Sequence, residues 1–564
     1  MSADHPICHT AATGPCAVCG QPGRPCARCR VHCYCGKEHQ KKHWPKHRAG
    51  CGSVALRDGV LVAAKDIPAH TVIMREQPSI SFPASPLTYN QNQENVMLCV
   101  ACCADLSEVQ PPCQCRHCGL PVCDKACSQA SAHQPECQAF QRAKYKVPFE
   151  HVLDARGILL GACVATLRVA LAYPKNPLLQ HLKRDLDFDE KGLKSSPEAT
   201  RDMLGYQTCI ALVIRHLRQR VGISWIPEAE LASAALIVCM FAESISGPSP
   251  DRWDDVAKQA YYGVLYVGMS LRKHSCFPNT GCKVLRQELN EYVVVTTRAV
   301  AAGECITNMH QGCHWIEDTL RRRDIVLVRW GFVCHCERCR DPTELGMYVG
   351  SPCCADCAGQ SKQSYLVPAN AELSRWRCEG CEKEMTAAAV KALTEPASKQ
   401  LMELHDASPD RLFKFIDAHL YPRGPLHRTH TLVLRASEYI RTDIFHRRAD
   451  ETASAGDLDR WEAMTRGLLR ALDRLLPGTC ESRVLHLMEL RRLVLRRLRV
   501  AQENGMLATM MGMFGGPRSQ DTGRKIAEYK QAVLEVNKEL RRYHFGREED
   551  DPKRSLREDP FGGR

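Results

Sequence analysis

The sequence predicts a multidomain α+β protein in which several zinc sites stabilise a β-rich core and a helical C-terminal half. Three observations support this prediction. A series of eight cysteine and histidine residues with metal-ligand spacing occurs twice, two β-rich blocks lie far apart in the chain, and the sequence after residue 387 reads almost entirely as helix. A chain of 564 residues has room for about two to four domains.

The repeated series consists of four consecutive ligand pairs. Each pair is short enough to hold one ion from a single turn, and a tetrahedral zinc ion needs two pairs, so each series predicts two ions. Disulfides or inert core thiols are the alternative, but free buried cysteines show no such repeated order. The first series is Cys16, Cys19, Cys26, Cys29, Cys35, His39, His47 and Cys51, with Cys33 and His43 as alternative ligands. The second is Cys99, Cys102, Cys115, Cys118, Cys123, Cys127, His133 and Cys137.

Two further sites are expected downstream. Cys334, Cys336 and Cys339 need a fourth ligand, for which Cys276 is the obvious donor. A two-knuckle ribbon supplies Cys354, Cys357, Cys378 and Cys381, with Cys353 as an alternative to Cys354 and a disulfide pair as the alternative to zinc. The sequence therefore predicts about six zinc ions.

Composition places these cysteines in a cellular context. The N-terminus lacks the basic and apolar segments of a signal peptide, and Arg168 and Glu243 interrupt the two longest apolar stretches, so no membrane span is expected. We therefore expect a reducing compartment, the cytoplasm and nucleus, where 33 cysteines indicate metal binding. The formal net charge of +12 falls to about +3 once thiolates and zinc ions are counted. Direct nucleic-acid or acidic-peptide binding then rests on local charge alone, such as Lys37, Lys41, Lys42, Lys46 and Arg48, for which a solvated helix face is the alternative.

The two β-rich blocks predict strand pairs. Residues 60–76 alternate and are rich in β-branched side chains, with a turn at Pro68, which indicates two short antiparallel strands. Residues 292–310 repeat this strand-turn-strand plan around Ala302 and Gly303. Helical spacing of apolar residues predicts helices over 152–172, 206–219, 228–243 and 481–503, a helix start at Ser408 and a stop at 476–478.

The order of these motifs resembles the SET and MYND domain family of protein methyltransferases. A strand pair, an eight-ligand finger, a helical stretch, His274-Ser-Cys276-x-Pro-Asn, Gly303-Glu-x-Ile-Thr and Cys334-x-Cys-x2-Cys follow one another as in that family. An additional first finger resembles the arthropod-type branch. The resemblance implies interleaved pairing, with Cys16, Cys19, Cys35 and His39 on one ion and Cys26, Cys29, His47 and Cys51 on the other.

The resemblance also implies an activity. Family members bind S-adenosylmethionine and transfer its methyl group to a substrate lysine, mainly by positioning and electrostatics. Carried over to this chain, the cofactor-binding positions are Gly59, Lys273, His274 and Phe332, and His310 takes the place of the catalytic tyrosine. The substrates implied are histones or other proteins, and the fingers imply binding of proline-containing peptides and chromatin association.

Three positions depart from the family pattern. Val60 stands where a glycine should allow the backbone to approach the cofactor, which introduces a steric cost. Lys273 replaces an asparagine, and a second cation about 5 Å from the sulfonium costs on the order of 3 kcal/mol unless it pairs with the cofactor carboxylate. His310 lacks the phenolic oxygen of tyrosine; it is either a base for the lysine proton or a structural histidine.

The expected organisation contains nine segments. These are a flexible N-terminus (1–15), a first MYND finger (16–51), the N-terminal part of the SET domain (52–98), a second MYND finger (99–137), a helical insertion (138–250), the SET core with its zinc site (251–340), a zinc ribbon (341–386), a helical domain resembling tetratricopeptide repeats (387–546) and a disordered tail (547–564).

Two functions follow as hypotheses. The first is a protein-lysine methyltransferase that uses S-adenosylmethionine and takes part in transcriptional regulation. The second is a catalytically impaired scaffold that recruits corepressors through its fingers. Phe332, His274 and Cys276 favour the enzyme, whereas Val60, Lys273 and His310 favour the scaffold.

Overall fold

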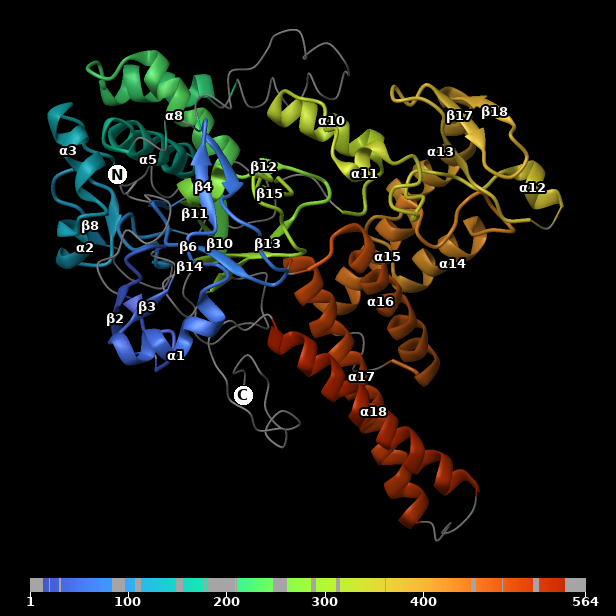
Figure 1. Ribbon diagram of the computed structural model, residues 1–564. Helices are drawn as coiled ribbons and strands as arrows, with labels where there is room; N and C mark the ends of the chain where they lie inside the picture. Colours follow the sequence, from blue (N-terminus) through green and yellow to red (C-terminus); the bar gives the residue numbers. More distant parts are fainter. Residues whose placement is uncertain are drawn as a thin grey trace.

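The computed structural model describes most of the chain (Figure 1). The described residues are 14–19, 21–29, 32–83, 97–106, 113–148, 156–176, 179, 182, 208, 210–246, 261–285, 291–310, 315–360, 362–447, 453–478, 480–510 and 517–542. None of the described helices is long and apolar enough to cross a membrane. The expected N-terminus up to residue 13 and the tail 547–564 lie outside the described residues.

The first finger combines a small antiparallel sheet with one helix. Its strands are β1 (Gly14–Pro15), β2 (Pro22–Pro25) and β3 (Cys33–Tyr34), in that order, and α1 (Lys37–His47) follows. Gly23 is required here, because a Cβ atom would lie 2.4 Å from the Tyr34 backbone. Strand β1 adds two residues before Cys16 to the sheet of the finger.

The first β-rich block pairs differently from the sequence prediction. Strand β5 (Val60–Ala63) forms a hairpin with β4 (Val54–Arg57), joined by Asp58 and Gly59, both with positive φ. Strand β6 (Val72–Glu76) instead joins β14 (Glu291–Thr296). The predicted pairing within 60–76 is thus wrong, because Ile67 pairs with Val300 and directs the chain into a different sheet.

The second β-rich block is also divided between sheets. Strand β14 lies between β13 (Thr280–Leu285) and β6, whereas β15 (Thr307–Asn308) pairs in parallel with β12 (Lys273–His274). Cys305 bridges to Val62, so the expected hairpin over 292–310 does not form. A third sheet contains β10 (Glu243–Ser246), β11 (Tyr261–Leu265) and β7 (Ile80–Phe82). These small sheets bring residues 273–276 and 305–310 together.

The second finger and the helical insertion share one hydrophobic core with these sheets. Their elements are β8 (Cys113–Gln114), β9 (Pro121–Val122), α2 (Lys125–Gln129), α3 (Gln134–Arg142), α5 (Arg156–Ala172), η1 (Tyr173–Lys175), η3 (His216–Val221) and α8 (Glu228–Phe241). Helix α8 stops two residues short of the prediction, because Ala242 is extended and Glu243 pairs with Val264. Residues 152–155, 206, 207 and 209 of the predicted helices lie outside the described part.

Short elements follow the core. Helices α9 (Val267–Ser270), α10 (Thr319–Trp330) and α11 (Glu337–Arg340) lie on either side of the second β-rich block in sequence. The ribbon consists of α12 (Ala355–Gly359), β16 (Leu366–Pro368), β17 (Arg375–Cys378) and β18 (Glu384–Thr386). Its three strands form a separate antiparallel sheet.

The C-terminal half is helical, as predicted. It contains α13 (Ala387–Glu403), α14 (Pro409–His419), α15 (Thr431–Arg447), α16 (Ala455–Leu475), α17 (Glu481–Met510) and α18 (Pro517–Arg542). The predicted start at Ser408 and the stop after Leu475 are confirmed. Successive helices from α14 to α18 pack on one another, and α17 with α18 extends away from the other domains (Figure 1). A tetratricopeptide-like architecture stays a prediction.

Candidate zinc centres and the His310 site

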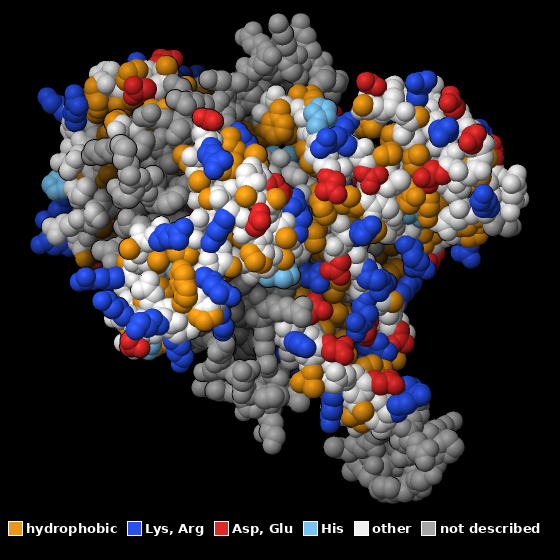
Figure 2. Space-filling model, in the orientation of Figure 1, with side chains coloured by type: hydrophobic (Ala, Val, Ile, Leu, Met, Phe, Trp, Pro, Cys, Tyr) orange, Lys and Arg blue, Asp and Glu red, His pale blue; other side chains and the backbone are white. Residues whose placement is uncertain are grey.

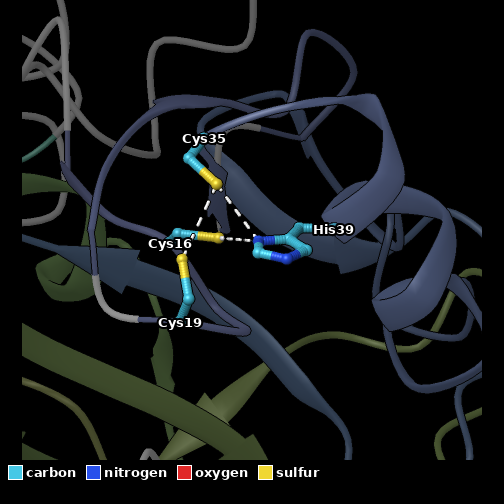
Figure 3. Close-up of side chains that lie close together, drawn as sticks. All are labelled: Cys16, Cys19, Cys35 and His39. Atoms are coloured by element: carbon cyan, nitrogen blue, oxygen red, sulfur yellow. Dashed lines mark hydrogen bonds between the residues drawn. The ribbon is translucent and has the colours of Figure 1, made fainter.

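The first finger contains a partly exposed ligand cluster made of Cys16, Cys19, Cys35 and His39 (Figure 3). Its four ligand atoms all lie within 4.8 Å of one another. The Cys35 Sγ atom is 3.1 Å from His39 Nδ1 and 3.6 Å from Cys19 Sγ. Ligands on a tetrahedral zinc ion with bonds of roughly 2.3 Å lie about 3.8 Å apart, so this spacing suits zinc.

The second cluster of this finger is fully buried and contains Cys26, Cys29, His47 and Cys51. His47 Nε2 lies 3.1 Å from Cys29 Sγ, while its Nδ1 atom is 2.9 Å from the Tyr34 hydroxyl. The same hydroxyl is 2.9 Å from His43 Nδ1. His43, the alternative ligand, therefore supports the cluster through Tyr34 and does not join it, and Cys35 occupies the other cluster in preference to Cys33.

The second finger repeats this arrangement. One cluster contains Cys99, Cys102, Cys123 and Cys127, and the other contains Cys115, Cys118, His133 and Cys137. These are the sets that interleaved pairing requires. Burial opposes ionisation of Cys115, but hydrogen bonds, led by that from Ser128 at 3.3 Å, lower the pKa of Cys115 to about 5. A thiol that ionises this readily is a ready metal ligand.

A fifth cluster joins two distant segments of the core. Cys276 Sγ lies 3.8 Å from Cys334 Sγ and 3.6 Å from Cys339 Sγ, and Cys336 completes the set. Two arginines of α10 contact this cluster, and the spacing of the cysteines in the sequence did not predict these contacts. Arg322, which is buried, lies 3.6 Å from Cys339 Sγ, and Arg323 donates hydrogen bonds to the Cys334 and Cys339 carbonyls.

The ribbon brings a sixth set of cysteines together. Cys354 Sγ lies 3.7 Å from Cys381 Sγ, and Cys357 Sγ lies 3.7 Å from Cys378 Sγ. Cys353, the alternative ligand, has its Sγ atom 4.0 Å from the Gln363 amide. The clusters are therefore compatible with several zinc ions.

Four residues predicted at a cofactor or catalytic site lie near one another. The His310 ring is 5.1 Å from the His274 ring, and the His274 ring is 6.0 Å from Phe332. Phe332 is 40% exposed, so one part of its ring faces solvent. Lys273 precedes His274 in β12, and its charge contributes to the low pKa of His310. Gly59 forms the β4–β5 turn, and Leu61 two residues later bonds to Ile306.

Burial and hydrogen bonding fix the state of His310. Burial, reinforced by the nearby His274, lowers the pKa of His310 to about 3, so the ring is neutral at physiological pH. Its Nε2 atom donates to the Arg272 carbonyl oxygen at 3.2 Å, which leaves Nδ1 as an acceptor. The ring also packs on Trp330, with centroids 4.2 Å apart.

Three buried polar atoms in this region have no hydrogen-bond partner among the described residues. They are His310 Nδ1, Asn308 Oδ1 and Trp330 Nε1. The sequence prediction did not include Asn308 or Trp330, because neither belongs to a ligand-spaced motif. Buried polar groups are normally satisfied, so these atoms, on Asn308, on His310 two residues later and on Trp330 packed against the His310 ring, indicate a place for a polar ligand.

Comparison with known proteins agrees with this architecture. Residues 16–51 match the MYND finger family. SET domain-containing protein SmydA-8 of Drosophila melanogaster is similar in two isoforms. Isoform B is 24% identical over 279 residues, which cover 47% of this chain and 52% of that protein. Isoform A is 22% identical over 323 residues, which cover 57% of this chain and 62% of that isoform. The chain thus spans between half and two thirds of these relatives, contains a MYND finger and is distantly similar to a SET domain-containing protein.

Proposed function

We propose that this chain is a SET and MYND domain protein whose core binds S-adenosylmethionine and methylates lysine side chains of proteins. The observation that carries this proposal is the group of partnerless atoms on Asn308, His310 and Trp330. The His310 ring lies beside His274, which in turn lies beside Phe332, and the family resemblance assigns both His274 and Phe332 to the cofactor. Distant similarity to a SET domain-containing protein supports the same assignment.

The chemistry of these atoms fits the cofactor. Asn308 Oδ1 is an acceptor suited to an ammonium group, and Trp330 Nε1 is a donor suited to a carboxylate, which leaves His310 Nδ1 for the substrate. S-adenosylmethionine carries both groups at its amino-acid end. The exposed Phe332 ring offers a surface on which adenine can stack.

The bound cofactor would supply an activated methyl group on its sulfonium. His310 would orient the substrate amine by accepting a hydrogen bond at Nδ1. With a pKa of about 3 it does not hold a proton at neutral pH, so the amine must lose its proton to solvent. This argument favours a positioning role for His310 over the role of general base.

A catalytically impaired scaffold is the second candidate. It is favoured by the packing of His310 on Trp330, since Trp330 in turn contacts Phe241 at 5.3 Å. Aromatic rings then occupy space beside the predicted reaction centre. MYND fingers are protein-interaction domains, so in either case the first finger would bind protein partners, for which we propose proline-containing peptides, corepressors and chromatin proteins in the nucleus and cytoplasm.

Titration of the zinc-loaded protein with S-adenosylmethionine tests the proposal. Phe332→Ala should weaken binding by roughly five- to tenfold through lost stacking. Val333→Ala is the matched control, because Val333 is adjacent and equally exposed at 42%. Binding together with transfer of labelled methyl groups to protein in a cell extract would support the enzyme. If the protein did not bind S-adenosylmethionine at millimolar concentration, the enzyme proposal would be contradicted and the scaffold function would remain.

A further inference from the structure

The two fingers are joined to the molecule in different ways. Five buried cysteines of the second finger belong to the main hydrophobic core, and Arg168 of α5 bonds to Glu136 inside that finger. The first finger has a small core of its own, formed by Cys16, Cys26, Cys29, Tyr34 and Cys51. The lysine side chains of α1 are exposed, and Figure 2 shows blue basic side chains gathered over the part of the surface where α1 lies.

The two fingers also carry opposite charge. Residues 16–51 contain eight Lys and Arg residues against one acidic residue, whereas 99–137 contain two against four. With zinc and thiolates included, the first finger holds about five positive charges and the second about five negative ones. Both fingers bring the same interleaved ligand sets together. Positive charge is therefore not a requirement of this fold, and its concentration on the first finger needs another explanation.

The charge follows one face of α1. Lys37, Lys41, Trp44 and Arg48 recur at spacings of three and four residues, which places them on the same side of the helix over about 17 Å. Trp44 is 44% exposed, and its ring meets the edge of His47 at 5.6 Å. Lys41 has an ion pair with Glu38 at 3.5 Å, but both side chains are exposed, so this pair competes weakly with another anion.

We propose that this face of α1 binds single-stranded nucleic acid. Lysine and arginine would contact successive phosphates, and Trp44 would stack on an unpaired base. An acidic peptide would satisfy the charges but would leave the exposed indole without a role. Paired bases in a duplex would likewise be unavailable to Trp44. This function is separate from methyl transfer and does not depend on the His310 site.

Fluorescence anisotropy of a labelled 15-nucleotide oligothymidylate tests the proposal with the full-length, zinc-loaded protein. The triple variant Lys37→Gln, Lys41→Gln, Arg48→Gln should bind at least tenfold more weakly. For this variant, the slope of log affinity against log salt concentration should be shallower by about 2. Each lost phosphate contact to a single strand contributes about 0.7 to that slope. Trp44→Leu should lower affinity about fivefold or more while leaving the salt slope unchanged.

A control variant with the same change in net charge distinguishes binding at this face of α1 from a general effect of protein charge. Lys362→Gln, Lys391→Gln and Lys414→Gln remove three exposed charges from the ribbon and from α13 and α14, and should leave affinity within twofold. Zinc content and thermal stability show that each variant is folded. Equal losses in both triple variants would overturn the proposal. The proposal would also be overturned if a polyglutamate peptide of matched charge displaced the oligonucleotide and Trp44→Leu had no effect on affinity. That result would assign the face to acidic peptides.

Discussion

His133 Nδ1 lies 2.9 Å from Glu136 Oε1, and both side chains are completely buried at the start of α3. Arg168 of α5 donates to Glu136 Oε2 at 2.9 Å and to the Val100 carbonyl at 2.8 Å. His133 Nε2 belongs to a candidate zinc cluster, so the carboxylate fixes the ring orientation of a candidate metal ligand. Through this chain of contacts the second finger is attached to the helical insertion.

Glu136→Gln should weaken both zinc binding and folding. The substitution leaves Arg168 buried without its anionic partner, which costs about 3–5 kcal/mol. Loss of the carboxylate should also lower zinc affinity of this cluster by about 10- to 100-fold. Chelator competition and urea unfolding measure the two effects. Glu228→Gln, at a side chain 68% exposed, is the control and should change neither quantity.

Cys276→Ser should release one zinc ion and loosen the core. Cys276 connects β12 to residues 334–339, so its loss separates segments that are distant in sequence. Elemental analysis should find one ion fewer than in the wild type, together with a lower melting temperature. Cys113→Ser is the control, because Cys113 is exposed and its Sγ lies outside the described clusters. Equal zinc loss in both variants would refute the assignment.

Sequence spacing predicted which cysteines and histidines come together, because the members of each pair lie within one turn of each other. The six clusters contain the residues that spacing selected, including Cys35 in preference to Cys33. Support around the ligands was not predictable in the same way. Arg168 was visible only as an interruption of an apolar helix, and its partner Glu136 lies 32 residues away.

Strand pairing was predicted less well than ligation. The alternation of apolar and polar residues located β5, β6 and β14, but the sequence prediction paired each of them with a neighbouring strand. In the structure β6 pairs with β14, more than 200 residues away. Side-chain alternation reports which face of a strand is buried and carries no information on its neighbour. The site around His310 depends on a second unpredicted pairing, that of β12 with β15, so Asn308 and Trp330 could not be placed there from sequence.

Glu76 should make stability depend on pH near neutrality. It accepts hydrogen bonds from Gly268 N and Met269 N at the start of α9, but burial dominates and raises the pKa of Glu76 to about 7. Because the folded pKa is raised, the contribution to stability is complete below about pH 4.5 and is lost as pH rises through about 7.

The measurement compares unfolding free energies at pH 6 and pH 8. Wild-type protein should lose about 1 kcal/mol more over this interval than Glu76→Gln. Glu403→Gln, at an exposed position, should retain the wild-type slope. If Glu76→Gln also retained that slope, the titration would belong to another group.

Lys273→Asn should raise affinity for S-adenosylmethionine. A positive charge at residue 273 repels the sulfonium, and its removal should improve binding by up to about 100-fold if the two charges lie about 5 Å apart. Calorimetry at two ionic strengths measures the change, which should shrink as salt screens the repulsion. Lys391→Asn, in the distant α13, controls for net charge. Weaker binding by Lys273→Asn would mean that the lysine pairs with the cofactor carboxylate.

His310→Tyr should act on turnover more than on binding. A phenol at this position can orient the substrate amine as the methyl group is transferred, an interaction that matters mainly in the transition state. The expected result is a higher kcat with little change in KM for the cofactor. His310→Phe is the matched control, because it supplies a ring of similar size without the hydroxyl. Since either larger ring must fit against Trp330, both variants share the same packing cost, and their difference isolates the hydroxyl. Equal turnover in the two variants would show that the hydroxyl has no role, and faster turnover by the wild type would show that His310 positions the amine better than a phenol does.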